Sequence, residues 1–201
     1  MTSKVAAIFT RLHSAEGEFR QDLVDQADRW GFTCHRRTAR FPADLRRAHR
    51  TLKPSLWTFL KAARPLPLLT APLVYSVSLP FLLLDGWMTL YQWVCFPIYG
   101  IPRVKRRDYL VIDHQRLAYL NAVEKIHCVY CGYANGLLAY ASEIAARTEQ
   151  YWCPIKHATP IPAPHGRYHL FADYGDAEGY RRDLPSLRGA LLKESQEPPG
   201  G

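Results

Sequence analysis

Residues 65–102 read PLPLLTAPLVYSVSLPFLLLDGWMTLYQWVCFPIYGIP, a run in which Asp85 is the single charge. A helix needs about 20 consecutive apolar residues to cross the hydrocarbon core of a bilayer, so the run is long enough for a membrane segment. Polybasic flanks are attracted to the anionic headgroups of lipids. The sequence therefore predicts a protein bound to an anionic membrane. The basic residues that border the run are Arg46, Arg47, Arg50, Lys53, Lys61 and Arg64 before it, and Arg103, Lys105, Arg106 and Arg107 after it.

The apolar run divides at Asp85-Gly86, where a charge and a flexible residue interrupt it. The first part, residues 65–84, is long enough for one helical crossing. The second part, residues 87–101, is shorter and rich in tryptophan and tyrosine, which prefer the membrane–water boundary. Positive charge on both flanks favours placing both ends in the cytoplasm. We therefore expect a tight two-crossing hairpin or a re-entrant, monotopic anchor, ahead of a single crossing.

The chain has 201 residues and a formal net charge of +8, which is room for a membrane segment and one modest globular part. The predicted fold class is mainly α, with a membrane-embedded hairpin or re-entrant helical segment followed by a small cytoplasmic helical domain. Four parts are expected: N-terminal amphipathic helices (1–64), the membrane segment (65–102), a Cys/His-bearing helical pair (103–158), and a linker, tail helix and disordered end (159–201).

The N-terminal part shows two helical patterns. Residues 15–30 carry apolar side chains at helical spacing and are followed by Gly31, a helix-end signal. Residues 43–63 continue the pattern with an interruption at Pro54, and their mixture of apolar and basic residues favours a helix lying in the membrane interface. The beginning of the chain lacks the apolar core of a secretory signal, so we expect this part to stay in the cytoplasm.

Residues 115–134 and 137–152 both read as helices, with a turn expected between them at Asn135-Gly136. Gly132 and Gly136 are four residues apart, a spacing that permits close approach of a second element. We prefer to interpret them as a helix end, because Asn-Gly is a turn signal. Further along the chain we expect a helix stop at Pro154, a proline-rich linker at 159–166, a tail helix near 176–194 and a disordered end at 195–201.

The predicted pair contains a Cys-x-x-Cys motif, Cys128 to Cys131. Five cysteines are an odd count, which argues against a disulfide framework, and Cys-x-x-Cys in a reducing compartment indicates metal or redox chemistry. Thiolates with imidazole suit zinc or iron, and carboxylates with imidazole suit a non-haem iron site. The candidate metal ligands are Cys128, Cys131, Cys153, His157, Glu124, His127 and Glu143.

These ligands allow two arrangements. A single Cys3His site would use Cys128, Cys131, Cys153 and His157, but it requires a break inside the second helix. A hairpin with two intact helices instead predicts two polar clusters. Simple packing of the cysteines, or a redox-active dithiol, remains open beside both. The members of the two clusters would be Glu124, His127, Cys128, Cys131 and Glu143 in one, and Asp113, His114, Cys153 and His157 in the other.

Residues 127–158 have a distinctive sequence, HCVYCGYANGLLAYASEIAARTEQYWCPIKHA. Together with the preceding YQWVCFPIYGIPRVKRRDYLVIDHQRLAYLN, it resembles a family of small bacterial membrane-associated proteins with no assigned activity, over roughly residues 65–180. The resemblance implies a bacterial inner-membrane protein and implies nothing about a reaction. With the flanking charges, it leads us to expect both termini in the cytoplasm.

The leading functional hypothesis is a membrane-anchored protein that binds zinc or iron through a thiolate/imidazole site at the cytoplasmic face. One alternative is a non-catalytic membrane-tethered scaffold whose tail tyrosines, Tyr168, Tyr174 and Tyr180, bind a protein partner. Another is a non-haem iron membrane enzyme that would use Glu124, His127, Glu143 and His114. Phosphate-loop and serine-hydrolase motifs are absent from the sequence, and no nucleic-acid-binding motif accompanies its positive charge.

Overall fold

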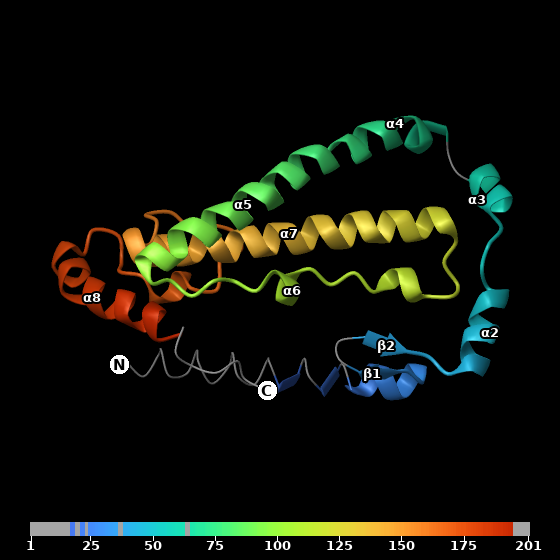
Figure 1. Ribbon diagram of the computed structural model, residues 1–201, viewed down its shortest axis with the longest axis horizontal. Helices are drawn as coiled ribbons and strands as arrows, with labels where there is room; N and C mark the ends of the chain where they lie inside the picture. Colours follow the sequence, from blue (N-terminus) through green and yellow to red (C-terminus); the bar gives the residue numbers. More distant parts are fainter. Residues whose placement is uncertain (1–16, 19–20, 23, 36–37, 63–64, 195–201) are drawn as a thin grey trace. The chain divides into compact units, whose positions relative to one another are not determined.

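The computed structural model describes residues 17–18, 21–22, 24–35, 38–62 and 65–194, and these are mainly α-helical (Figure 1). The predicted disordered end, 195–201, lies outside the described residues. The chain divides into two compact units, which are described separately. Unit 1 comprises Met1–Ala62 and Asp113–Lys125, and unit 2 comprises Ala63–Ile112 and Ile126–Gly201.

The described residues of unit 1 confirm that both N-terminal patterns are helical, while the location of the second in the membrane interface stays a prediction. Residues 24–30 are helical, and Gly31 follows with a positive φ of 63°, a conformation that glycine adopts without strain. The second pattern forms two helices interrupted around Pro54. A small antiparallel hairpin that the sequence analysis did not predict precedes them. The elements are β1 (Thr33–His35), β2 (Thr38–Arg40), α2 (Ala43–Thr51), α3 (Leu56–Ala62) and a 3₁₀ turn (His114–Arg116).

The apolar run of unit 2 forms helices α4 (Pro65–Ser76) and α5 (Ser78–Tyr99), separated only by Val77. The separation has a local cause, because the ring of Pro80 obstructs the carbonyl of the residue four positions earlier, Ser76. Helix α5 continues without interruption through Asp85-Gly86. The predicted turn at this position, and with it the two-crossing hairpin, is therefore wrong.

The predicted Cys/His-bearing helical pair is a single helix, α7 (Ala122–Trp152). Asn135-Gly136, the expected turn, lies in its middle, where the Asn135 side chain donates a hydrogen bond to the carbonyl of Cys131 at 2.9 Å. The side chain thus bonds along the helix instead of turning the chain. Pro154 follows the helix as predicted.

Unit 2 packs three parts of the chain around one core: α5, the segment 101–112 with its short helix α6 (Arg106–Tyr109), and α7. Figure 1 shows α5 and α7 running side by side. The predicted tail helix is α8 (Ala177–Lys193), which adds a side chain to this core, and a 3₁₀ turn (Tyr168–Leu170) precedes it. The buried apolar residues of the core are Phe96, Ile101, Val104, Leu137, Tyr140, Ile144 and Leu191.

Gly132 and Gly136 bring the segment 101–112 against α7. A Cβ atom added at Gly136 would lie 2.7 Å from the Tyr109 carbonyl oxygen and 3.0 Å from Leu110 Cα. At Gly132 it would lie 3.3 Å from the carbonyl oxygen of Val111. The preferred interpretation of these glycines as a helix end is therefore wrong. The two glycines permit close approach to α7, but the element that approaches is the irregular segment 101–112 and not a second helix.

Gly136→Ala is expected to lower the free energy of unfolding by about 1–3 kcal/mol, the usual cost of inserting a carbon into a packed core. The backbone at Tyr109 and Leu110 would have to move, because no flexible side chain alone can relieve the contact. Gly189→Ala in α8 is the matched control, since a Cβ atom there meets nothing within 4 Å. It should stabilise the protein by up to about 1 kcal/mol through helix propensity. Urea unfolding in mild detergent measures the free energy of unfolding of both variants. If both substitutions stabilised the protein, or both destabilised it, the packing argument would be contradicted.

Candidate functional site

Helices α4 and α5 present a continuous apolar surface. Among the described residues, Leu68–Tyr99 form a helical stretch that is long and apolar enough to cross a membrane. None of the residues in the most apolar part of this stretch is buried within the protein. On α5 the exposed side chains recur at helical spacing and lie on one face, whereas on α4 they are exposed all around the helix. The exposed large apolar residues of α4–α5, named here the apolar face, are Leu66, Leu68, Leu69, Leu73, Val74, Val77, Leu79, Leu82, Leu83, Trp87, Leu90, Trp93, Val94 and Ile98.

The opposite side of α5 carries polar residues that bond to the rest of unit 2. Asp85 accepts hydrogen bonds from Arg106 (Nη2 to Oδ2, 2.6 Å; Nε to Oδ1, 3.1 Å) and from the Tyr133 hydroxyl at 2.9 Å. Its carboxylate is only 14% exposed. The hydroxyl of Thr89, one turn further along α5, is 3.4 Å from that of Tyr140. The lone charge of the apolar run is thus an inward-facing partner of Arg106.

Gln92 continues this polar side one turn beyond Thr89 and is almost completely buried. Its carbonyl oxygen accepts a hydrogen bond from the backbone N–H of Val104 at 2.9 Å. Its amide nitrogen donates to the Val104 carbonyl at 3.4 Å and also to the Tyr140 hydroxyl. One side chain therefore satisfies both backbone polar groups of Val104 and joins α5 to α7. The sequence analysis missed this residue, although a glutamine within an apolar run is a signal of such a role.

The predicted metal ligands are spread along α7 and do not form the Cys3His site. Cys128 and Cys131 lie in the helix, while Cys153 follows its last residue, Trp152. At about 1.5 Å of rise per residue, Cys131 and Cys153 are roughly 30 Å apart along the helix axis. The single four-ligand site is therefore wrong, because α7 has no break. His157 lies beyond Cys153, where its ring stacks on Tyr168 with centroids 6.0 Å apart.

The remaining predicted ligands already have partners. Glu124 and Asn121 form a capping box at the start of α7: the Asn121 N–H donates to Glu124 Oε2 at 2.7 Å, and the Glu124 N–H donates to Asn121 Oδ1 at 3.0 Å. The ring of His127 stacks on Tyr75 with centroids 5.7 Å apart. Glu143 accepts a hydrogen bond from Arg147 Nε at 2.8 Å.

The part of the chain that the structure describes contains no group of three or more histidine, cysteine, aspartate or glutamate residues placed to hold a metal ion. The two clusters that a helical hairpin would have built do not form, because the hairpin itself does not. Zinc or iron binding by the pair Cys128 and Cys131 stays a prediction. Cys131 is exposed and Cys128 partly so, and both are free thiols.

Arg167, which the sequence analysis did not single out, is the centre of a charged network between α7 and α8. It donates to Glu143 Oε1 at 2.9 Å, to Gln150 Oε1 at 2.9 Å and to both carboxylate oxygens of Glu194 at 2.8 Å. Its side chain is only 12% exposed. Arg147 completes the network through Glu143 and donates to the Pro102 carbonyl at 2.7 Å. The positive charges of the two arginines thus neutralise the negative charges of the two glutamates.

The network shifts the pKa values of its members. Burial alone would lower the pKa of Arg167, but its hydrogen bonds to Glu194 and Glu143 raise it well above the ordinary arginine value. Burial alone would raise the pKa of Glu194, but the hydrogen bonds and charge of Arg167 bring it below its usual range. Both groups are therefore charged at neutral pH, and the network acts as a structural clamp.

The tail tyrosines that were candidates for partner binding differ in their surroundings. The Tyr168 hydroxyl accepts a hydrogen bond from the His157 N–H at 2.6 Å, so this residue is part of the fold. The Tyr180 hydroxyl is 3.5 Å from the Trp152 carbonyl. Tyr174 is 69% exposed. The structure holds no partner chain, so partner binding by the tail stays a prediction.

No known protein family, curated protein or solved structure matches the chain.

Proposed function

We propose that this protein is a monotopic membrane protein, in which the apolar face of α4–α5 lies in one leaflet and the rest of unit 2 forms a helical platform on the cytoplasmic side. The observation that carries the proposal is the one-sided exposure of α5. Large apolar side chains line its outer face, and Asp85, Thr89 and Gln92 bond inward on the other. A helix with one apolar face and one polar face can lie in the membrane interface, with its apolar face among the acyl chains.

The packing of the segment 101–112 argues against a helix that crosses the bilayer. This segment is mostly irregular, bonds to α5 through Val104 and Arg106, and contacts α7 at Gly136. Irregular backbone exposed to lipid does not occur in the hydrocarbon core, because its polar groups would lose their hydrogen bonds to water. A crossing α5 would carry the segment into the core. The exposed basic residues that would be carried with it are Arg103, Lys105 and Arg107.

Length and charge support the same orientation. The stretch Leu68–Tyr99 has 32 residues, which at about 1.5 Å per residue is roughly 48 Å. The hydrocarbon core is about 30 Å thick, so a straight crossing by the whole stretch would leave apolar side chains in water. Helix α5 alone, with 22 residues, is short enough to cross, and the packing of the segment 101–112 is the argument against that arrangement. The basic residues on both flanks are then on the same side of the membrane, next to anionic headgroups.

Leu83→Glu combined with Trp87→Glu is expected to reduce binding to vesicles containing anionic lipid by about 100-fold or more. Each charge placed among acyl chains costs roughly 2–3 kcal/mol. Both side chains are exposed, at 67% and 73%, so the change leaves the core of unit 2 intact. Vesicle flotation measures the binding, and Tyr174→Glu, at an exposed aromatic outside α4–α5, is the matched control. Equal flotation of the two variants would contradict the proposal.

The native cysteines report the topology. Cys34 precedes the apolar run, Cys153 follows it, and both are exposed. We expect single-cysteine variants that retain only Cys34 or only Cys153 to react with a membrane-impermeant maleimide from the same side of native membranes. Reaction in inverted vesicles, compared with intact spheroplasts, assigns that side as cytoplasmic. Labelling of the two cysteines from opposite sides would show a crossing and overturn the in-plane arrangement.

A further inference from the structure

Unit 1 contains a cavity of about 470 Å³ whose lining is mostly apolar and aromatic. Its volume is within the usual range of small-molecule sites. Three parts of the unit meet there: the end of the first helix with Phe32, Phe41 with helix α2 and its C-cap residue, and the loop that precedes α7. Among the lining residues are Trp30, Phe32, Phe41, His49, Leu52 and Tyr119.

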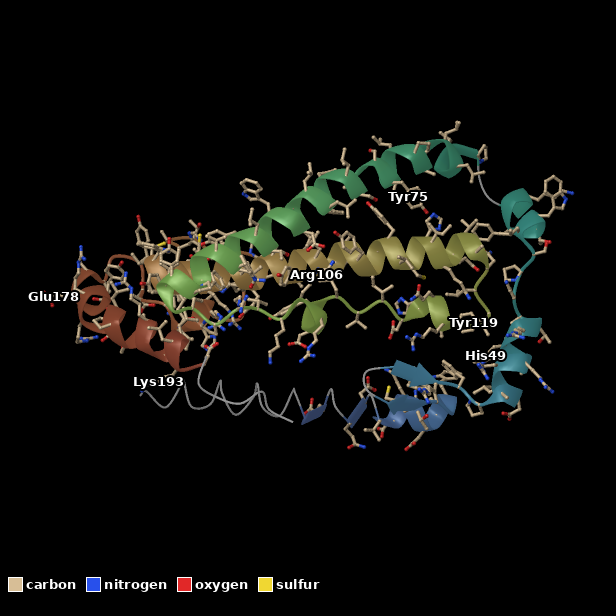
Figure 2. The ribbon with its side chains drawn as sticks, viewed as in Figure 1. His49, Tyr75, Arg106, Tyr119, Glu178 and Lys193 are labelled. Carbon is tan, nitrogen blue, oxygen red and sulfur yellow. The ribbon has the colours of Figure 1, made fainter. Side chains whose placement is uncertain are left out.

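The rings of this cavity form a connected series. Phe32 and Phe41 have centroids 5.4 Å apart, Phe41 and His49 lie 5.5 Å apart edge to face, and His49 and Tyr119 lie 5.5 Å apart, also edge to face. Figure 2 shows His49 and Tyr119 as neighbours. Trp30, Leu52 and Leu117 also line the cavity, and Trp30 and Leu52 are 62% and 71% exposed. Large apolar side chains thus line an open depression that no described residue of unit 1 fills.

A second cavity of about 350 Å³ shares Phe41 with the first and has a different chemistry. Its lining includes Arg40, Arg46 and Arg116. Among the described residues, no carboxylate forms an ion pair with any of these three arginines, so their positive charges are not neutralised by one. Guanidinium groups bind carboxylates and phosphates through charge-assisted hydrogen bonds.

We propose that unit 1 binds a single-chain anionic amphiphile, with its acyl chain in the aromatic cavity and its carboxylate or phosphate headgroup at Arg40, Arg46 and Arg116. The adjoining apolar and cationic cavities carry this inference, since they match the two ends of such a molecule. The site goes beyond the membrane anchor of unit 2 and uses none of its residues.

The arrangement of the rings favours an acyl chain over a nucleotide. Stacking a base needs an open aromatic face, and reading a base needs polar groups along its edge. Phe41, His49 and Tyr119 instead pack edge to face on one another, and the cavity offers little polar surface. An alkyl chain requires only apolar contact, which these side chains supply.

The test uses the full chain in phosphatidylcholine nanodiscs and a palmitate that carries a photoreactive diazirine on its chain. We expect saturable labelling of peptides that contain Trp30, Phe41, Leu52 or Tyr119. Both unlabelled palmitate and 1-palmitoyl lysophosphatidic acid should compete, and their relative strength distinguishes a carboxylate from a phosphate headgroup. Hexadecyltrimethylammonium, inorganic phosphate and AMP should not compete at the same concentration.

Arg46→Glu combined with Arg116→Glu should weaken this labelling about tenfold or more, because charge-assisted bonds would be replaced by repulsion. Both side chains are exposed, so the folding of unit 1 is preserved. Arg181→Glu, at an exposed arginine of α8, is the matched control and should change nothing. Labelling confined to α4–α5, equal labelling of the double variant, or displacement by AMP would overturn the proposal. Vesicle flotation tests the anchor separately, so the two proposals can fail independently.

Discussion

Replacing Arg167 with methionine is expected to lower the free energy of unfolding of unit 2 by about 3 kcal/mol. Removing one partner of a buried ion pair typically costs roughly 3–5 kcal/mol, because the other charge stays buried without compensation. Here the lower end applies, since Glu143 keeps its bond to Arg147 and Glu194 is partly exposed. Methionine retains much of the side-chain volume, so the loss measures the interactions of the guanidinium.

Arg182→Met is the matched control for this change. Arg182 lies on α8, pairs with the adjacent Asp183 and is 73% exposed, so its removal should cost less than about 1 kcal/mol. Thermal or urea unfolding in mild detergent, followed by circular dichroism, compares the two variants. Similar losses for both would show that the network does not clamp α7 to α8.

The same substitution should change the pH dependence of stability. The pKa of Glu194 is below its ordinary value in the folded protein, where burial opposes the shift and Arg167 more than overcomes it. A lowered folded-state pKa contributes stability above the unfolded-state value, and this is lost as the pH falls through the folded-state value. Unfolding measured across the acidic range should therefore show a shallower decline in Arg167→Met than in the unmodified protein.

Replacing Gln92 with leucine is expected to cost about 3 kcal/mol. Leucine has a similar volume, but it leaves the N–H and carbonyl of Val104 without their partner in the core, and it leaves the Tyr140 hydroxyl only its longer contact with Thr89. Each buried polar group left unsatisfied costs roughly 1–3 kcal/mol, partly offset by the apolar character of leucine. The same unfolding measurement applies.

Gln115→Leu provides the comparison, because Gln115 is exposed in unit 1 and its replacement should change stability by less than about 0.5 kcal/mol. A neutral effect of Gln92→Leu would mean that the segment 101–112 is held mainly by apolar contacts. An increased susceptibility of this segment to proteolysis in Gln92→Leu would support the expected mechanism directly.

Local pattern was sufficient to predict several elements. The apolar run, the helix end at Gly31, the interruption at Pro54 and the tail helix follow from periodicity and from the backbone restrictions of glycine and proline. The start of α7 was also readable, since Asn121 and Glu124 have the spacing of a capping box, although our sequence analysis assigned Glu124 to a metal site. These features depend on neighbours within about four residues.

The errors share one physical origin. Asp85-Gly86 and Asn135-Gly136 carry turn residues, yet both pairs lie within helices. Asp85 is accommodated because Arg106 reaches it from the segment 101–112, and Gly136 because the backbone of Tyr109 and Leu110 occupies the space of its missing side chain. Both partners come from far along the chain, so the local sequence cannot distinguish a turn from a contact. The misplaced second turn then produced the incorrect metal clusters.

The amino-acid sequence by itself determined that this protein is mainly helical, basic and equipped with an apolar segment suited to a membrane, because composition and periodicity are properties of the linear chain. Only the tertiary structure decided which side of that segment is free and which chemistry-bearing residues meet. The helices pass straight through the expected turns, so Cys131 and Cys153 are held apart while Arg167, Glu143 and Glu194 come together. Contacts between distant segments depend on how whole helices pack, which no local pattern encodes.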